Sequence, residues 1–125
     1  MMKVYLDDMR TPPDGWVLVK TAQEAIDLLI TNDVEKISLD HDLGEEENGT
    51  GYDVITWLEK EVYENNFIPP IIHIHTANPV AREKMEAGTR NIVRFKKKYA
   101  LFLEWGCKNN SPLFHTEILH HELSS

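Results

Sequence analysis

Cysteine is almost absent from the chain: Cys107 is the single one among 125 residues. One cysteine excludes a framework of intrachain disulfides and a cysteine-rich zinc module, and it suits a reducing environment, so we expect a cytoplasmic protein. Long apolar runs are missing too. No stretch reaches the roughly 18 apolar residues of a membrane span, and the amino terminus, MMKVYLDDMR, turns acidic too early for a signal peptide. We therefore expect no membrane partner.

Basic side chains are in deficit, with 13 lysines and arginines against 21 aspartates and glutamates, which gives a net charge of −8. Affinity for duplex nucleic acid depends on neutralising phosphates with basic side chains, so this balance excludes a general nucleic-acid coat but leaves room for a local basic site. The hydrophobic share of 42% and the charged share of 27% are those of an ordinary globular protein. Because no linker or repeat divides the sequence, we expect one domain over residues 1–125.

The regular structure that the sequence predicts alternates between strands and helices. Apolar patterns of the two periods indicate strands at 3–7, 16–20, 34–40 and 71–74, and helices at about 21–32, at about 52–65 and from 78 onward. Such alternation predicts an α/β fold with a mainly parallel sheet of four to five strands and helices on both faces. The run of Ile71, Ile72 and Ile74 predicts a central strand that is covered on both faces.

Local signals mark the ends of two predicted helices. Thr21 and Glu24 have the spacing of a capping box, in which side chains satisfy the free amides of a helix start. Asn78 followed by Pro79 is a second strong start, since asparagine caps helices and proline is tolerated at the first helical position. Gly88 then predicts the end of this last helix.

The motif-bearing part of the chain covers about residues 3–88, and the sequence over 89–125 allows two structures. Asn91 to Phe95 has the composition of a fifth strand. The alternative is a helix with one face formed by Ile92, Phe95, Tyr99 and Phe102. Periodicity does not separate the two. An amphipathic pattern over 111–123 predicts a terminal helix.

Carboxylates follow two of the predicted strands. Asp7 and Asp8 come directly after the first strand, and Asp40 ends the third. The carboxyl ends of parallel strands meet at one edge of a sheet, so these carboxylates converge and repel one another unless a cation neutralises them. A hard divalent ion with oxygen ligands, Mg²⁺ or Mn²⁺, is the metal that this set predicts. The alternative is structural, with Asp8 capping a turn and Asp40 forming an Asx-turn.

Two histidines near these carboxylates are candidates for proton transfer. His41 follows Asp40 directly, and His75 lies near the end of the fourth strand. Histidine titrates close to neutral pH, so either one can act as a general acid or base. The alternative for His41 is a ring that packs over its loop. His73 shares a strand face with His75, and we expect it to be a buried, hydrogen-bonded side chain.

Several polar residues are candidates for binding phosphate at the same edge. Arg10 offers a fork of donors, Thr76 ends the fourth strand, and the helix that starts after Asn78 offers backbone amides. The only basic run, at 96–98, predicts either a solvated face or one phosphate-pairing lysine. The histidines near the terminus lack the spacing of a metalloprotease helix and predict surface residues: His115, His120 and His121.

Four motifs together resemble the cyclic-phosphate processing receiver-like family, a branch of the response-regulator receiver fold. They are LDDMR at 6–10, SLDHDLG at 38–44, GYDV at 51–54 and HIHTANP at 73–79, and the similarity covers roughly Lys3 to Met85. The resemblance implies a receiver/flavodoxin-like three-layer sandwich. The histidines, Asn78 and the long acidic loop distinguish this branch from signalling receivers.

The resemblance also assigns roles to individual residues. It implies that Asp7 and Asp8 are the acidic pair that holds Mg²⁺, that Asp40 accepts a phosphoryl group, and that Thr76 is the switch hydroxyl. One lysine among Lys96, Lys97 and Lys98 would match the lysine after the fifth receiver strand.

The leading hypothesis from the sequence is a metal-dependent phosphoesterase, a hydrolase of the cyclic phosphodiesterase type. Its substrate would be a cyclic phosphate, such as the 2′,3′-cyclic end of an RNA or a nucleotide, so the expected partner is a phosphate-containing small molecule or an RNA end. One alternative is a signalling or binding module that is phosphorylated on Asp40. The other is a catalytically inactive receiver fold that serves as an interaction protein.

Overall fold

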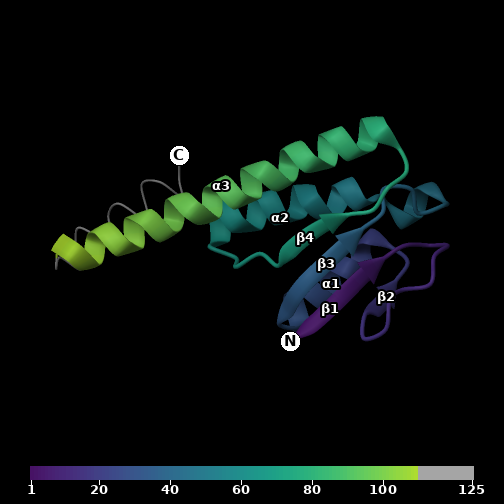
Figure 1. Cartoon of the computed structure of the whole chain (residues 1–125), viewed down its shortest axis with the longest axis horizontal. Helices are drawn as coiled ribbons and strands as arrows, with labels where there is room; N and C mark the ends of the chain where they lie inside the picture. The colour runs from purple at the N-terminus through teal and green to yellow at the C-terminus, as the bar shows by residue number, and fades with distance from the viewer. Residues whose placement is uncertain (110–125) are drawn as a thin grey trace.

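Four parallel strands form one sheet in a computed structural model that describes the backbone of residues 1–109 and the side chains of residues 1–96. The order across the sheet is β2-β1-β3-β4, where β1 is Met2–Leu6, β2 is Val17–Val19, β3 is Val34–Leu39 and β4 is Ile71–Ile74. The helices are α1 (Ala22–Thr31), α2 (Gly51–Asn65) and α3 (Pro79–Asn109), with a short 3-10 helix, η1 (Glu46–Asn48), before α2 (Figure 1). The predicted receiver/flavodoxin-like α/β class is confirmed.

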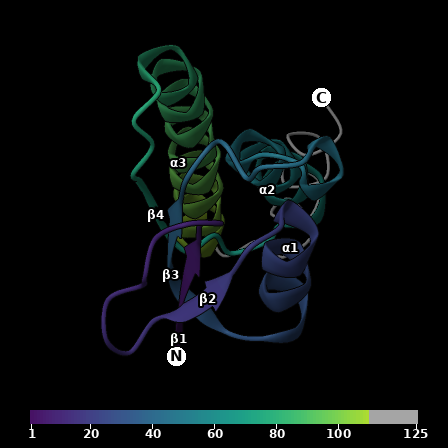
Figure 2. The same ribbon diagram turned by 90° about the vertical axis from the view of Figure 1, so that its right-hand side faces the viewer.

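The helices α1 and α2 lie on the same side of the sheet (Figure 2). Parallel crossovers are right-handed, and the connections β2–α1–β3 and β3–α2–β4 cross the sheet in the same direction, so both helices reach one face. The connection from β1 to β2 runs the other way and contains no helix. The helix α3 packs along α2 and contributes Met85 and Ile92 to the same core, so within residues 1–109 no helix forms the second layer that the sequence predicts. We call the uncovered side of the sheet the open face.

The hydrophobic core lies between the sheet and the helices. The strands direct Val4, Leu6, Ile37 and Leu39 into it, and all four side chains are fully buried. The three helices contribute Ala25, Leu29, Val54, Ile55, Leu58, Met85 and Ile92, among others. Because side chains alternate along a strand, the residues between them, such as Tyr5 and Ser38, face the open side.

The predicted helix starts are confirmed by their capping contacts. Oγ1 of Thr21 accepts the backbone N–H of Glu24 at the start of α1. At α3, Oδ1 of Asn78 accepts the N–H groups of the residues at 80 and 81. The start of α2 has a full capping box between Thr50 and Asp53. Three helix starts are thus determined by short local signals.

Gly88 lies inside α3, so the helix end predicted there is wrong. A Cβ atom on Gly88 would lie 2.5 Å from Cγ2 of Ile55 and 2.8 Å from Oε1 of Glu59, both on α2. The missing side chain lets α3 pack closely along α2 (Figure 1), and this close approach, not a left-handed turn, explains the glycine. Asn91 to Phe95 therefore belongs to a helix, as the second alternative proposed. The helix predicted over 111–123 lies outside the described residues.

The strand β4 is an edge strand within the described part of the chain, so the prediction of a central strand that is covered on both faces is wrong. Its carboxyl end leads directly into α3, and residues 79–109 form no fifth strand. Ile71 is 55% exposed, whereas Ile72 and Ile74 pack against the core. His73, predicted to be buried, is exposed on the open face. Within residues 1–109, no helix has both the length and the apolar character needed to cross a bilayer.

Candidate functional site

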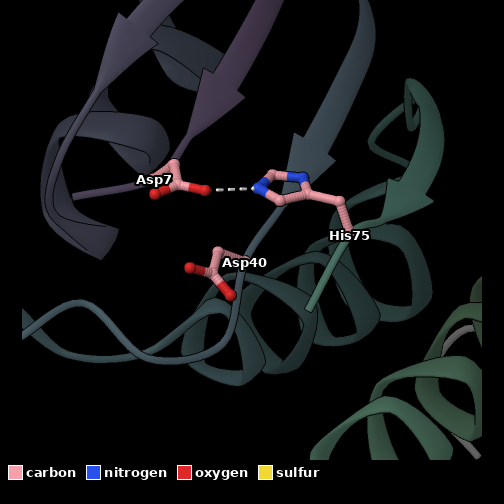
Figure 3. A group of neighbouring side chains, drawn as sticks. All are labelled: Asp7, Asp40 and His75. Atoms are coloured by element: carbon pink, nitrogen blue, oxygen red, sulfur yellow. Dashed lines mark hydrogen bonds and ion pairs between the residues drawn. The ribbon is translucent and has the colours of Figure 1, made fainter. Parts of the chain in front are cut away.

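Three side chains from three strand ends converge at the carboxyl edge of the sheet. Asp7 follows β1, Asp40 follows β3, and His75 follows β4 (Figure 3). One possible ligand atom of each residue lies within 4.8 Å of those of the other two. The parallel sheet thus brings together groups that are up to 68 residues apart in the sequence, as predicted for Asp7 and Asp40.

Asp7 is a buried carboxylate that is surrounded by hydrogen-bond donors. Its side chain is 1% exposed; Oδ1 accepts the backbone N–H groups of Met9 at 2.8 Å and Arg10 at 2.9 Å, and Oδ2 lies 2.9 Å from Nε2 of His75. Burial on its own raises the pKa of Asp7, but these hydrogen bonds and the charge interaction with His75 together bring it below its ordinary value. Asp7 is therefore ionised at neutral pH, and we assign the Nε2 proton of His75 to a hydrogen bond toward it.

His75 reaches Asp7 by extending across the open face over Ser38. In the sheet register, Ser38 lies between Tyr5 of β1 and His73 of β4, two residues before Asp40, and its small side chain leaves room for the imidazole to lie over it. Nδ1 of His75 lies 2.7 Å from Oγ of Ser38. The imidazole also stacks on the ring of Tyr5, with centroids 4.4 Å apart and planes 6° from parallel. Three residues, Asp7, Ser38 and Tyr5, therefore fix the orientation of this imidazole.

Asp40 is positioned by backbone contacts at the end of β3. Its N–H donates to the carbonyl of Leu6, and its Oδ1 accepts the N–H of His41 at 2.8 Å. Gly51, the first residue of α2, packs on its other side, where a Cβ atom would overlap the carbonyl oxygen of Asp40. The glycine of the GYDV motif thus allows the start of α2 to approach the site.

The donor set of Asp7, Asp40 and His75 fits a divalent cation. Two carboxylates offer the oxygen ligands that Mg²⁺ and Mn²⁺ prefer, and an imidazole nitrogen makes the set more favourable for Mn²⁺ than an all-oxygen set would be. To act as a ligand, Nε2 of His75 would give up its proton and its hydrogen bond to Asp7, and Nδ1 would carry the ring proton and donate it to Oγ of Ser38. The residues present could therefore hold a divalent metal ion.

Asp8, the third predicted metal ligand, is not part of this group. Its Oδ2 would lie 3.2 Å from a Cβ atom on Gly44, so the carboxylate is directed toward the loop between β3 and α2. The alternation of side-chain direction after β1 explains the difference, because consecutive residues leave a strand on opposite sides. In the structure, His75 takes the place beside Asp7 and Asp40 that the sequence had predicted for Asp8.

His41 and Arg10 flank the three-residue group. Nδ1 of His41 lies 3.0 Å from Oδ1 of Asp42, and its side chain is 21% exposed. Arg10 is half exposed; Nη1 donates to the carbonyl of His75 at 3.1 Å, and Nε lies 3.9 Å from Oδ2 of Asp7. Arg10 therefore lies next to the group and is accessible to a ligand, whereas His41 adjoins the group through its backbone and directs Nδ1 of its partly exposed ring to Asp42.

The start of α3 does not offer the free amides that were predicted to bind phosphate. Oδ1 of Asn78 accepts the N–H groups of Val80 and Ala81, and Pro79 has no N–H group. Thr76 is 4% exposed, and its Oγ1 accepts the N–H of Asn78. Asn78 is thus a helix cap, and a contact between Thr76 and phosphate stays a prediction.

The predicted lysine run does not reach the site through its first member. Lys96 lies on α3 and lines a cavity with Pro69 and Pro70, which precede β4 and so lie at the opposite edge of the sheet. The side chains of Lys97 and Lys98 lie outside the described residues, as do the histidines at 115, 120 and 121.

Sequence reasoning missed Ser38 and Tyr5, the two residues that orient His75. Their signal was present only in the register, since the alternation of β1 and β3 places both on the face opposite the core. The role of Ser38 becomes evident only when the neighbours of β3 in the sheet are known.

A family model described as "Cyclic-phosphate processing Receiver domain" matches residues 2–91, which include Asp7, Asp40 and His75, the three residues that could hold a metal ion and that we call the metal-binding group. No curated protein and no solved structure matches the chain.

Proposed function

The chain belongs to the cyclic-phosphate processing receiver family, and from this premise we propose that it is a metal-dependent phosphoesterase that opens a cyclic phosphate. The 2′,3′-cyclic end of an RNA or a nucleotide is the substrate that we infer. The observation that supports the proposal is the convergence of Asp7, Asp40 and His75 within 4.8 Å at the carboxyl edge of the sheet, where ligands bind in open α/β folds.

The protein's own groups have distinct tasks in this proposal. A divalent cation, when bound, offsets the charge of the phosphate and polarises a P–O bond. Asp7 and Asp40 hold this ion, and His75 completes the set, oriented by Ser38. Arg10 is charged and accessible, so it orients the phosphate with the guanidinium donors that its contact with His75 leaves available.

Ring opening requires one proton to leave and one to arrive. The oxygen of a water molecule bonds to phosphorus and loses a proton, while one P–O bond of the ring breaks and the departing ribose oxygen gains a proton. The product is a phosphate monoester. Each transfer needs a group that can exchange a proton near neutral pH.

Of the two histidines, His41 suits this proton transfer better than His75. Asp42 orients its Nδ1, and its Nε2 makes no hydrogen bond to any described residue. Both ring nitrogens of His75 are already engaged, one with Asp7 and the other with Ser38. We therefore assign proton transfer to His41 and ion binding to His75.

A substrate assay tests the assignment. The protein is incubated with a 2′,3′-cyclic mononucleotide in Mg²⁺, in Mn²⁺ and in chelator, and the monoester product is separated by chromatography. We expect turnover only with metal, and a loss of about 100-fold or more in kcat for His41→Gln, within the range of general acid–base catalysis. His73→Gln is the matched control, because His73 lies outside the metal-binding group. Equal rates for the two variants would contradict the role of His41.

Phosphorylation of Asp40 is a second candidate function. The observation that favours it is the placement of Asp40 and Thr76 after neighbouring strands of a receiver-type sheet. Acetyl phosphate with Mg²⁺ should then add one phosphoryl group to the intact protein, as measured by mass spectrometry, and not to Asp40→Asn. An unchanged mass, under conditions that label a control receiver, would exclude this function.

A further inference from the structure

We propose that the open face of the sheet binds single-stranded RNA, with the 3′ end of the strand at the metal-binding group. The inference extends the proposed function, because it names the kind of molecule that carries the cyclic phosphate. A 2′,3′-cyclic phosphate requires a 2′ oxygen, so a nucleic acid that ends in one is RNA. The binding surface itself is argued from residues outside the metal-binding group.

A row of aromatic rings crosses the open face beside the site. Trp16 contacts the ring of Tyr5 edge-on, with centroids 6.2 Å apart, and Tyr5 stacks on His75 at 4.4 Å. Trp16 and Tyr5 are partly exposed, and His73, on the same face, is exposed. Unpaired bases stack on aromatic side chains on the open faces of sheets in single-strand binding proteins. The row therefore offers a platform for bases that leads to the metal-binding group.

Two lysines supply a positive charge on the same face. Lys3 of β1 and Lys36 of β3 lie directly opposite each other in the sheet register. Like charges in opposite positions repel and destabilise a sheet. Within the described residues, no carboxylate forms an ion pair with either lysine. In a protein with a net charge of −8, this pair marks a local site for an anion.

The spacing between the lysines and the metal-binding group suits a short stretch of RNA. Lys3 precedes Asp7 by four residues of extended chain, which is about 13 Å. Stacked nucleotides rise about 3.4 Å each along a strand, so roughly four nucleotides would span this distance. The bases would meet the aromatic row while the backbone passes the lysines.

The positive charge of the open face favours RNA over a second copy of the chain as the molecule that binds there. A symmetric dimer through this face would place the same surface, with its lysine pair, against itself. The exposed apolar side chains there are also few, with Leu18 at 36% and Ile71 at 55% exposure. Positive charge next to exposed rings fits an anionic strand of bases better than it fits a copy of itself.

Fluorescence anisotropy with a labelled eight-nucleotide RNA that ends in a 3′ hydroxyl tests the proposal. Chelator is present, so metal and turnover play no part. We expect binding that weakens with salt, and a loss of affinity of tenfold or more for Lys36→Glu and Lys3→Glu. Each charge removed should reduce the slope of log K against log salt by about 0.7. Lys36→Gln gives a milder form of the same change if the reversal impairs folding.

Lys60→Glu is the matched control, because Lys60 is exposed on α2, on the other side of the sheet. Absent binding, or equal affinities for Lys36→Glu and Lys60→Glu, would overturn the proposal. A dimer in sedimentation experiments that Leu18→Glu dissociates would also overturn it, by showing a second copy on the face. Turnover of a cyclic mononucleotide without RNA binding removes this inference alone, whereas RNA binding without any turnover removes the proposed chemistry alone.

Discussion

At the scale of single residues, the contact between Asp7 and His75 organises the site. Asp7 is almost fully buried, yet its pKa is lowered because two backbone N–H groups and His75 surround its oxygens. His75 is in turn held by Ser38 and Tyr5. A buried carboxylate of this kind stays charged only while its donors remain in place.

The stability of the protein should depend on the ionisation of Asp7. Its pKa in the folded state lies below the ordinary value of 3.8, so the folded state binds its proton less readily than the unfolded chain does. The stabilisation is fully present above the unfolded pKa and is lost as pH falls through the folded pKa. Urea unfolding should therefore show a steeper loss of stability below about pH 4 for wild type than for Asp7→Asn. An identical acid dependence would contradict this account, and exposed Asp33→Asn serves as the control.

Replacing Ser38 should affect the metal site through His75. Ser38→Ala removes the hydroxyl that lies 2.7 Å from Nδ1 of His75. Hydrogen bonds to the ring nitrogen that does not bind the metal typically contribute 10–100-fold to metal affinity. We expect about tenfold weaker Mn²⁺ binding in calorimetry, at the lower end of that range. Thr56→Ala, which removes a hydroxyl contact on α2, should leave the affinity unchanged. Unaltered binding in Ser38→Ala would show that this contact does not position the imidazole.

The sequence was informative about Asp7 and Asp40 because both follow strands directly, and parallel strands bring their ends together. It was less informative about the third ligand. His75 is directed into the group by its contact with Ser38, and this contact depends on the register of neighbouring strands, which the pattern of one strand does not contain. Asp8 was predicted as a metal ligand because it is adjacent to Asp7 in the sequence. Adjacency does not reveal on which side of the strand a carboxylate lies.

At the scale of elements, the packing of α3 along α2 illustrates what periodicity can and cannot predict. The apolar stripe predicted α2, and Asn78 followed by Pro79 predicted where α3 begins. Gly88 was misinterpreted because a glycine in a helical pattern is compatible both with a helix end and with close helix packing. Only the contact with Ile55 on α2 separates the two.

Two neighbouring positions on α3 should differ in the residue that they prefer: glycine should be more stable than alanine at 88, and alanine more stable than glycine at 87. At position 88, Gly88→Ala places a Cβ atom 2.5 Å from Cγ2 of Ile55, and such overpacking destabilises by about 1–3 kcal/mol. At exposed position 87, Ala87→Gly should also destabilise, by about 1 kcal/mol, because alanine is the better helix former there. Chemical denaturation measures both. Stabilisation by Gly88→Ala would contradict the close contact between α2 and α3.

The start of α2 links helix packing to the site. Gly51→Ala would force a Cβ atom onto the carbonyl oxygen of Asp40, and a backbone atom cannot move aside as a flexible side chain can. We expect destabilisation of at least about 1–3 kcal/mol, together with weaker Mn²⁺ binding in calorimetry. Unchanged stability and metal affinity would show that α2 can shift without disturbing Asp40.

At the scale of the whole molecule, the sheet has a covered face and an open face within residues 1–109. The topology explains this, because both helical crossovers run in one direction and the return from β1 to β2 has no helix. The sequence predicted the α/β class but not the open face, since the patterns of single elements do not specify the order of strands. The charged side chains behind the net charge of −8 are also unevenly distributed. Carboxylates gather at the site, whereas Lys3 and Lys36 lie on the open face.

A divalent cation should stabilise the whole fold. Binding to the native state alone adds about 2.7 kcal/mol when the free ion is at 100 times its Kd, so Mn²⁺ should raise the Tm of wild type. Asp40→Asn should lose this rise, and without metal it should be at least as stable as wild type, because the repulsion from Asp7 is relieved. Asp33→Asn should behave as wild type. An equal rise in Tm for Asp40→Asn would place the metal elsewhere.

The central claim is that the metal held by Asp7, Asp40 and His75 makes the protein open a cyclic phosphate. The most direct test follows a 2′,3′-cyclic nucleotide by phosphorus NMR while Mn²⁺ is titrated into wild type and Asp40→Asn. The account predicts that the phosphate monoester forms at a rate proportional to the fraction of wild-type protein with metal bound, and that Asp40→Asn loses both binding and turnover. A wild-type protein that is saturated with metal and leaves the cyclic phosphate intact would contradict it.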